Sequence, residues 1–175
     1  HVYLFYNYNS LGMTSICVTY RKVEPDTTKK TLKVALRAID DNNVGTFRVL
    51  NRNILPVTYK DKFYNDIKGY PERFKRLAYS GANVIGAVAC RLENDPSSEE
   101  HKRLYLMVIG VLAAYRGLGV GSQLLEYVLD QASKYHHEVK SIYLHVQTSN
   151  EDAVTFYKKF GFKIIETIDD YYTRV

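Results

Sequence analysis

The sequence is poor in cysteine, the residue that forms disulfides and many metal sites. Its 175 residues include no tryptophan and two cysteines, Cys17 and Cys90. Neither cysteine has neighbours at metal-ligand spacing, and Cys90 lies in an apolar run typical of a core strand. We therefore expect no metal site and a reducing compartment, the cytoplasm, with the nucleus as an additional location. No stretch approaches the roughly 18 consecutive apolar residues of a membrane helix.

Composition favours a folded, globular chain. Hydrophobic residues make up 46% of the sequence and charged residues 25%, with a formal net charge of +5. The length suits one domain with its own core, which we expect over residues 31–175, after an extension of unknown structure over residues 1–30. The positive charge is mild and forms no dense Lys/Arg block, so sequence-specific nucleic-acid binding is not expected.

The most informative segment is a glycine-rich turn between a predicted strand and a predicted helix. The apolar run 104–112 predicts a buried strand, and the turn that follows is Arg116-Gly117-Leu118-Gly119-Val120-Gly121. The helix is indicated by four apolar residues on one face: Val120, Leu124, Val128 and Ala132. Free N–H groups at a helix N-terminus, with glycines that let the backbone come close, form a cradle for a phosphate.

Two nucleotide-binding patterns do not fit this turn. A P-loop needs a lysine followed by Ser or Thr after the last glycine, whereas Gly121 is followed by Ser122-Gln123. The dinucleotide fingerprint needs a different glycine spacing and an acidic residue about 20 positions on, which the strand 141–146 does not supply. What remains is Arg-x-x-Gly-x-Gly, for which a tight turn that merely permits strand–helix packing is the structural alternative.

A second signature follows the first. Segment 141–147 alternates as a strand, so a parallel βαβ unit is the default. Asn150 then begins a helix that carries Phe156-Tyr157 and ends at Gly161-Phe162. Together the two signatures resemble the GNAT acetyltransferase superfamily. The resemblance implies an α/β (α+β) class, the GNAT acyl-CoA N-acyltransferase fold with a mixed, splayed central sheet flanked by helices, and acetyl-CoA without a metal.

The other segments fit the same order of elements, βααβββαβαβ. We expect strands over 32–39, 162–165 and near 171–175, helices over 44–54, 58–67 and 152–160, a hairpin of 74–79 with 83–92, and a polar surface loop over 94–100.

By this resemblance the glycine loop binds the pyrophosphate of coenzyme A. The implied contacts come from the strand end, the loop and the helix start: Ile109, Gly110, Val111, Arg116, Gly117, Leu118, Gly119, Val120, Gly121 and Ser122. Asn150 and Tyr157 complete the set, with the Tyr157 hydroxyl near the sulfur of the leaving thiolate. An N-cap role and helix packing are their structural alternatives. Gly117 stands where the family has a second basic residue, which is expected to soften coenzyme A affinity.

Tyr105 and His145 are the candidate catalytic residues. Each lies on the alternating face of one strand of the predicted βαβ unit, so neighbouring strands bring both to one cleft. A histidine titrates near neutral pH and suits removal of an amine proton through water. An α-amine, with a pKa of about 8, gives up that proton more readily than a lysine. A hydrogen-bonded histidine and a packed tyrosine on a sheet face are the structural alternatives.

Segments 54–64, 102–107, 143–150 and 166–175 are similar to a narrower family, the NatE-type protein N-terminal acetyltransferases. That resemblance implies acetylation of nascent or mature proteins at an N-terminal Met followed by a hydrophobic residue. It also implies NatA-type auxiliary and catalytic subunits at the ribosome as candidate partners. The implied peptide pocket consists of Leu55, Pro56, Val57, Tyr59, Met107, Tyr171 and Tyr172. Leu55 stands where the family commonly has phenylalanine, so the pocket is expected to be reshaped.

Two other functions stay open at this point. One is a GNAT enzyme that acetylates lysine side chains or small amines. The other is a non-catalytic coenzyme A-binding subunit of a ribosome-associated complex, which the presence of both Tyr105 and His145 disfavours.

Overall fold

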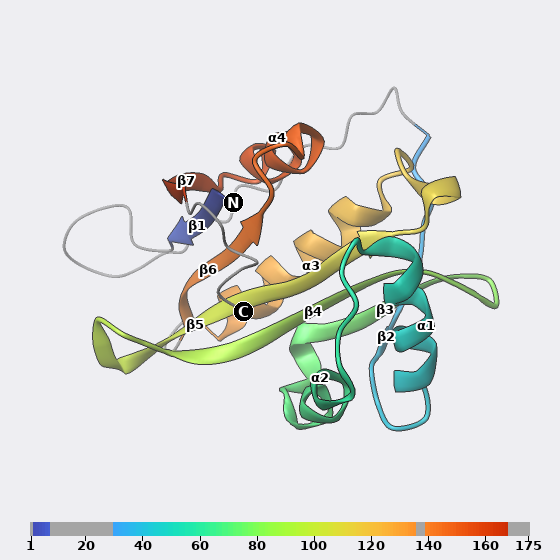
Figure 1. Ribbon diagram of the computed structural model, residues 1–175, viewed down its shortest axis with the longest axis horizontal. Coiled ribbons are helices and arrows are strands. Elements are labelled where there is room, and N and C mark those ends of the chain that lie inside the picture. The colour runs from blue at the N-terminus through green and yellow to red at the C-terminus, as the bar shows by residue number, and fades with distance from the viewer. Residues whose placement is uncertain (1, 8–29, 136–138, 168–175) are drawn as a thin grey trace. The chain divides into compact units, whose positions relative to one another are not determined.

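The computed structural model describes residues 2–7, 30–135 and 139–167, which are drawn as coloured ribbon in Figure 1. The chain divides into two compact units. Unit 1 holds residues 2–7, 93–105, 135 and 139–167, and unit 2 holds residues 30–92 and 106–134. Two long strands, β4 (Asn83–Asp95) and β5 (Ser98–Val111), continue along the chain from one unit into the other. The units are described separately below.

The sheet of unit 2 begins with the predicted hairpin. Strand β2 (Ala35–Ala38) pairs antiparallel with β3 (Lys75–Ser80), and β3 pairs antiparallel with β4. Gly81, at the turn between β3 and β4, has a φ of 59°, a backbone conformation that glycine adopts without a steric penalty. The hairpin prediction is confirmed, whereas β2 covers only the last part of the strand expected over 32–39.

Helices cover both faces of this sheet. On a strand, successive side chains point to opposite faces, and Ala87 and Ala89 of β4 pack in one core with helix α1 (Val44–Ile54). Gly86 faces the other way, where an added Cβ would lie 3.3 Å from Cδ1 of Leu124 on helix α3 (Val120–Lys134). The core on the α1 side contains Ile39, Phe47, Leu50, Tyr64, Ile67, Leu77, Ala87, Ala89 and Val108.

Short helices connect α1 to β3 and β5 to α3. They are α2 (Asp61–Asp66) and the 3₁₀ turns η1 (Ile67–Gly69), η2 (Glu72–Phe74) and η3 (Ala113–Tyr115). Helix α1 ends just before Pro56, and α2 with η1 covers most of the helix predicted over 58–67.

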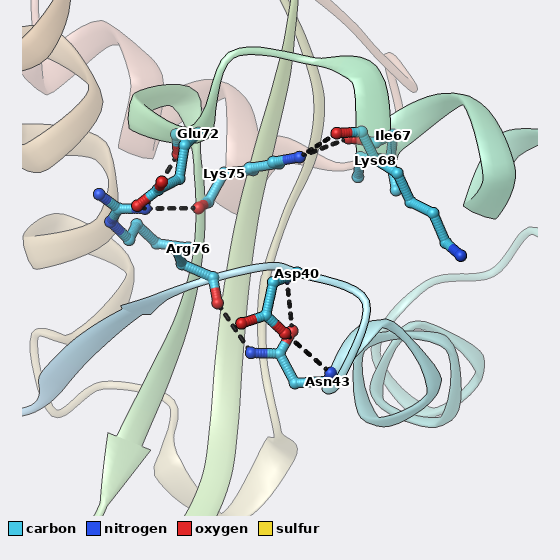
Figure 2. Close-up of polar contacts among 8 residues, drawn as sticks. Asp40, Asn43, Ile67, Lys68, Glu72, Lys75 and Arg76 are labelled. Atoms are coloured by element: carbon cyan, nitrogen blue, oxygen red, sulfur yellow. Dashed lines mark hydrogen bonds and ion pairs between the residues drawn. The ribbon is translucent and has the colours of Figure 1, made fainter.

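A buried lysine fixes the end of η1 against the start of β3. The Lys75 side chain is only 4% exposed, and its Nζ donates to the carbonyl oxygens of Ile67 at 2.7 Å and Lys68 at 2.9 Å (Figure 2). Figure 2 also shows the turn that begins α1, where the Asp40 carboxylate accepts from the backbone N–H of Asn43 at 3.1 Å. Burial lowers the pKa of Lys75.

The expected polar loop over 94–100 is wrong, because β4 and β5 run through it and leave two residues between them. The Asp95 carboxylate accepts from both the N–H (2.9 Å) and the hydroxyl (2.6 Å) of Ser97 and so closes a tight turn. The pKa of Asp95 is lowered chiefly by the hydrogen bond from the Ser97 hydroxyl. The segment is polar because it is an exposed hairpin tip, and polarity alone does not distinguish a tip from a loop.

Unit 1 contains the parallel strand pair that the βαβ pattern predicts. Strand β6 (Val139–Val146) runs parallel to β5, with Leu104 opposite Ile142 and Tyr105 opposite Tyr143. The other strand pairs of known register are antiparallel, so the predicted mixed sheet is confirmed. Helix α4 (Glu151–Lys159) is capped by Asn150, whose Oδ1 accepts from the N–H of Ala153 at 3.1 Å.

Unit 1 also contains a strand that the sequence analysis did not predict. Strand β1 (Val2–Asn7) lies between β6 and β7 (Lys163–Thr167) and pairs antiparallel with both, so part of the 1–30 segment belongs to the sheet. The division into a 1–30 extension and a 31–175 domain stays a prediction. The strand expected near 171–175 lies outside the described residues.

Over the described ranges, no helix combines the length and apolar character needed to cross a bilayer. Within the same residues, no group of three or more His, Cys, Asp or Glu side chains is placed to hold a metal ion. Cys90 is fully buried on β4, and this burial raises the pKa of its thiol, as befits a core residue.

Candidate active site

The two candidate catalytic side chains meet on neighbouring strands of unit 1. Tyr105 on β5 and His145 on β6 place the phenol oxygen 3.3 Å from Nδ1 of the imidazole. Their rings make an edge contact, with centroids 5.5 Å apart and planes at 71°. Both side chains are half-buried. The predicted adjacency of the two strands is therefore confirmed, and the geometry allows a proton to pass between phenol and imidazole.

Three further side chains surround this pair, and sequence reasoning gave none of them a role. Tyr143, opposite Tyr105 in register, stacks on it with centroids 4.9 Å apart and planes at 26°. The Tyr143 hydroxyl donates to Oε2 of Glu93 at 2.5 Å. Arg103 Nε donates to the same carboxylate oxygen at 3.2 Å, and its guanidinium lies 4.6 Å from the centre of the Tyr143 ring.

In unit 2, the glycine loop has the backbone conformation that its residues predict. Gly117 and Gly119 have φ values of 75° and 74°, in the left-handed region where a Cβ is unfavourable. The loop leads directly into α3 at Val120, which is buried, with Gly121 and Ser122 in the first helical turn. This is the arrangement of backbone N–H groups that anions bind.

Arg116 adds an exposed cation beside this loop. Its Nε donates to the carbonyl oxygen of Val111 at the end of β5, at 3.1 Å. Within the loop, the carbonyl oxygen of Leu118 accepts from the backbone N–H of Leu32 at 3.0 Å. Ile109 and Gly110 are half-buried and lie at the end of β5, directly before Val111. A positive-φ loop, a helix N-terminus and an exposed arginine together fit a pyrophosphate, so these residues are suited to hold that part of coenzyme A.

The two predicted coenzyme A contacts on α4 lie in unit 1. Asn150 is exposed and serves as the N-cap of α4, the structural role that the sequence analysis gave as the alternative to coenzyme A binding. Tyr157 is 6% exposed, with its ring centre 5.5 Å from that of Phe162. Both roles in coenzyme A binding stay predictions.

The predicted peptide-pocket residues of unit 2 cluster at the end of α1. Leu55 follows the last turn of α1 and, like Tyr59 and Met107, packs against the core, whereas Pro56 is exposed and Val57 is half-buried. The Tyr59 hydroxyl donates to the carbonyl oxygen of Met107 at 3.1 Å, and its ring stacks on Phe63 at 3.9 Å. The role of these residues in a peptide pocket stays a prediction. Tyr171 and Tyr172 lie outside the described residues.

The order of the strands and the glycine loop before α3 define the class of acyl-CoA-dependent N-acyltransferases. Comparison with known proteins agrees: the chain belongs to the Acetyltransferase (GNAT) family, whose sequence profile matches residues 44–162. The fold expected from the resemblance is confirmed.

The chain is also similar to two individual proteins named as N-acetyltransferases. The chain is 45% identical over 143 residues to N-alpha-acetyltransferase 50 of Danio rerio, which covers 82% of each protein. It is 42% identical to the probable N-acetyltransferase san of Drosophila melanogaster over 142 residues, 81% of this chain and 74% of that protein.

Among solved structures, Arabidopsis thaliana Naa50 in complex with the bisubstrate analogue CoA-Ac-MVNAL is 47% identical, with a TM-score of 0.73. The match covers 82% of this chain and 92% of that one. Arabidopsis thaliana NAA60 in complex with acetyl-CoA, at 21% identity and a TM-score of 0.68, shares the fold; that match covers 77% of this chain and 86% of NAA60.

Proposed function

We propose that this protein transfers an acetyl group from acetyl-CoA to the α-amine of protein N-termini, with a preference for Met followed by a hydrophobic residue. The observation that carries the proposal is the contact of 3.3 Å between the Tyr105 hydroxyl and Nδ1 of His145. The identity of 42–47% to enzymes of this type supports it. The analogue bound to Arabidopsis Naa50 joins coenzyme A to a peptide that begins Met-Val.

The chemistry assigns complementary tasks to the two side chains. Acetyl-CoA supplies the activated acetyl group, and the α-amine must be neutral to attack its carbonyl carbon. A C–N bond then forms as the C–S bond breaks, and coenzyme A leaves as a thiolate that takes up a proton. His145 accepts the amine proton through water, because a neutral imidazole is a base of suitable strength near pH 7. Tyr105 holds the imidazole through its hydroxyl and orients the water that joins His145 to the amine.

The proposed preference for an N-terminal methionine is supported by the apolar side chains at the end of α1 in unit 2. Leu55 and Val57 offer the apolar surface that a methionine side chain buries, and Met107 adds a polarisable, adaptable contact. The Tyr59 hydroxyl, which donates to the Met107 carbonyl oxygen, is a polar group that can exchange this bond for one to a peptide backbone.

A peptide panel with acetyl-CoA tests the proposal. Peptides beginning Met-Leu or Met-Val should be acetylated faster than peptides beginning with Ser, and N-terminally blocked peptides with internal lysines should react slowly. Equal rates on free and blocked peptides would favour a lysine acetyltransferase and reject the proposal.

Variants of the pair test the mechanism in the same assay. His145→Ala and Tyr105→Phe should each lower kcat about a hundredfold, the lower end of what general acid–base catalysis contributes. Acetyl-CoA binding, measured by calorimetry, should persist. His101→Ala serves as the matched control, because it removes another half-buried histidine, on β5, the strand that carries Tyr105. Unchanged kcat in both variants would reject the assignment.

Two finer parts of the proposal concern the cell. We place the protein in the cytoplasm, with the nucleus as a second location, and in contact with NatA-type subunits at the ribosome. The location is supported by the low cysteine content of the sequence, and the association by the resemblance to NatE-type enzymes. Microscopy of the tagged protein and co-sedimentation with ribosomes test them; absence from the ribosomal fraction at low salt would reject the association.

A further inference from the structure

The side chains around Tyr105 form a connected chain within unit 1. Glu93 on β4 contacts Tyr143 on β6, and Tyr143 contacts both members of the proposed catalytic pair. We infer that Glu93 is a positioning residue for acetyl transfer, which acts through the Tyr143 ring on Tyr105. This inference rests on the function proposed above and extends it to residues to which neither the sequence resemblance nor the proposed mechanism gives a role.

The first link is the hydrogen bond between Tyr143 and Glu93. At 2.5 Å from oxygen to oxygen, it lies at the short end of the range for a hydroxyl donating to a carboxylate. Such charge-assisted bonds are about twice as strong as those between neutral groups. The Tyr143 hydroxyl therefore donates its proton to a hydrogen bond with Glu93, and this bond fixes the hydroxyl end of the Tyr143 side chain.

Arg103 strengthens this link from two directions. It shares Oε2 of Glu93 with the phenol, and its guanidinium lies against the Tyr143 ring. The Glu93 and Arg103 side chains are 18% and 26% exposed, so their ion pair is shielded from water more than a surface pair is. Ring and hydroxyl are therefore both held, which restricts rotation of Tyr143 about its side-chain bonds.

The second link runs from Tyr143 to the catalytic pair. Its ring stacks on Tyr105 at 4.9 Å and meets His145 edge-on, with centroids 6.1 Å apart. The Tyr105–His145 contact, at 3.3 Å, is at the long end for a hydrogen bond, so a small rotation of Tyr105 breaks it. A fixed Tyr143 prevents that rotation, and misplacement by about 1 Å can cost up to a hundredfold in rate.

Three variants test the inference in the peptide assay. Glu93→Gln keeps the size of the side chain and removes its charge, Tyr143→Phe keeps the ring and removes its hydroxyl, and the third variant combines both changes. Each single variant should lower kcat roughly tenfold, with KM for peptide and for acetyl-CoA within about twofold of wild type. The double variant should fall no further than the single ones, because both changes break the same link.

Glu100→Gln is the matched control, since it makes the same chemical change at an exposed position on β5 and should leave kcat unchanged. Rates are normalised to the folded fraction from circular dichroism. Multiplied losses in the double variant, a change confined to KM, or an unchanged kcat in Glu93→Gln would overturn the inference.

A second readout does not require activity. The stacked Tyr143 ring should shift the NMR signals of the Tyr105 ring protons upfield, and this shift should shrink in Glu93→Gln and not in Glu100→Gln. A shift that is the same in Glu93→Gln as in wild type would refute the positioning role even if the wild-type protein acetylated none of the peptides. Inactive wild-type protein with the expected shifts would instead reject the proposed function alone.

Discussion

Replacement of Lys75 by methionine should destabilise the fold more than any surface lysine replacement in the same region. The Lys75 ammonium lies in a buried position and donates to two carbonyl oxygens at the end of η1 (Figure 2). Methionine fills much of the same volume and donates nothing, so both carbonyl oxygens lose a charged donor in a place where water has little access.

The magnitude follows from the two bonds and from the burial of the charge. A hydrogen bond to a charged group contributes about 1.5–3 kcal/mol to the free energy of unfolding. Removal of the buried ammonium also removes its desolvation penalty, which offsets part of the loss of the two bonds. We expect the free energy of unfolding to fall by about 3 kcal/mol. For a protein of this size, about 2–4 °C of Tm is lost per kcal/mol, so Tm should fall by roughly 9 °C.

The assay is thermal unfolding followed by circular dichroism, with Lys68→Met as the matched control. Lys68 is the second residue of η1, its side chain is exposed, and its Nζ pairs with Asp41 at 2.9 Å. Exposed pairs contribute little, so this variant should melt within about 2 °C of wild type. Equal Tm values for the two variants would refute the reasoning.

The effect of pH gives an independent check on Lys75. Burial lowers its pKa in the folded state below the unfolded value of 10.5. Between these two pKa values the unfolded chain binds more protons than the folded one, so stability rises with pH in that window. The difference in unfolding free energy between wild type and Lys75→Met should therefore grow as pH rises through the folded pKa. A difference that shrinks over this window would contradict the burial of a charged amine.

The remaining predictions concern three glycines and a cap. Gly119→Ala should lower Tm more than Gly117→Ala. Both glycines have positive φ, but only at Gly119 does the new Cβ come within 3.0 Å of Thr31. Calorimetry should also show that Gly119→Ala binds acetyl-CoA more weakly than wild type does. Gly110→Ala should cost about 1–3 kcal/mol in urea unfolding, since its Cβ would lie 2.8 Å from the isoleucine that ends α1. Asn150→Ala should cost about 1 kcal/mol in the same assay through loss of the α4 cap.

Periodicity predicted the parts of the site that lie on regular elements. Tyr105 and His145 could be paired because side chains alternate along a strand and because a strand–helix–strand segment of this length makes parallel neighbours. The glycine loop was predicted from residue type instead: glycine favours positive φ and close approach of the backbone to an anion, so Gly117 and Gly119 indicate the loop by themselves.

Contacts that depend on long-range pairing could not be predicted in this way. No local pattern indicates that residues 2–7 insert between two strands near the other end of the chain. The role of Glu93 was missed for a related reason. Its partner Tyr143 is 50 residues away, and a lone glutamate at the end of an apolar strand is ordinarily a solvated residue.

The hairpin between β4 and β5 matters for Glu93, because the pairing of these two strands decides which face of the sheet Glu93 occupies. A slip of one residue in the pairing of β4 with β5 would turn every side chain on one of these strands to the opposite face. Asp95 and Ser97 close the tip at which the two strands meet. Farther from the tip, the cross-strand contacts Lys102–Asn94 and Arg103–Glu93 hold Glu93 beside β5, where its carboxylate accepts from the Tyr143 hydroxyl. A change in the length of this tip should therefore disturb the contact between Glu93 and Tyr143, although the segment resembles a surface loop.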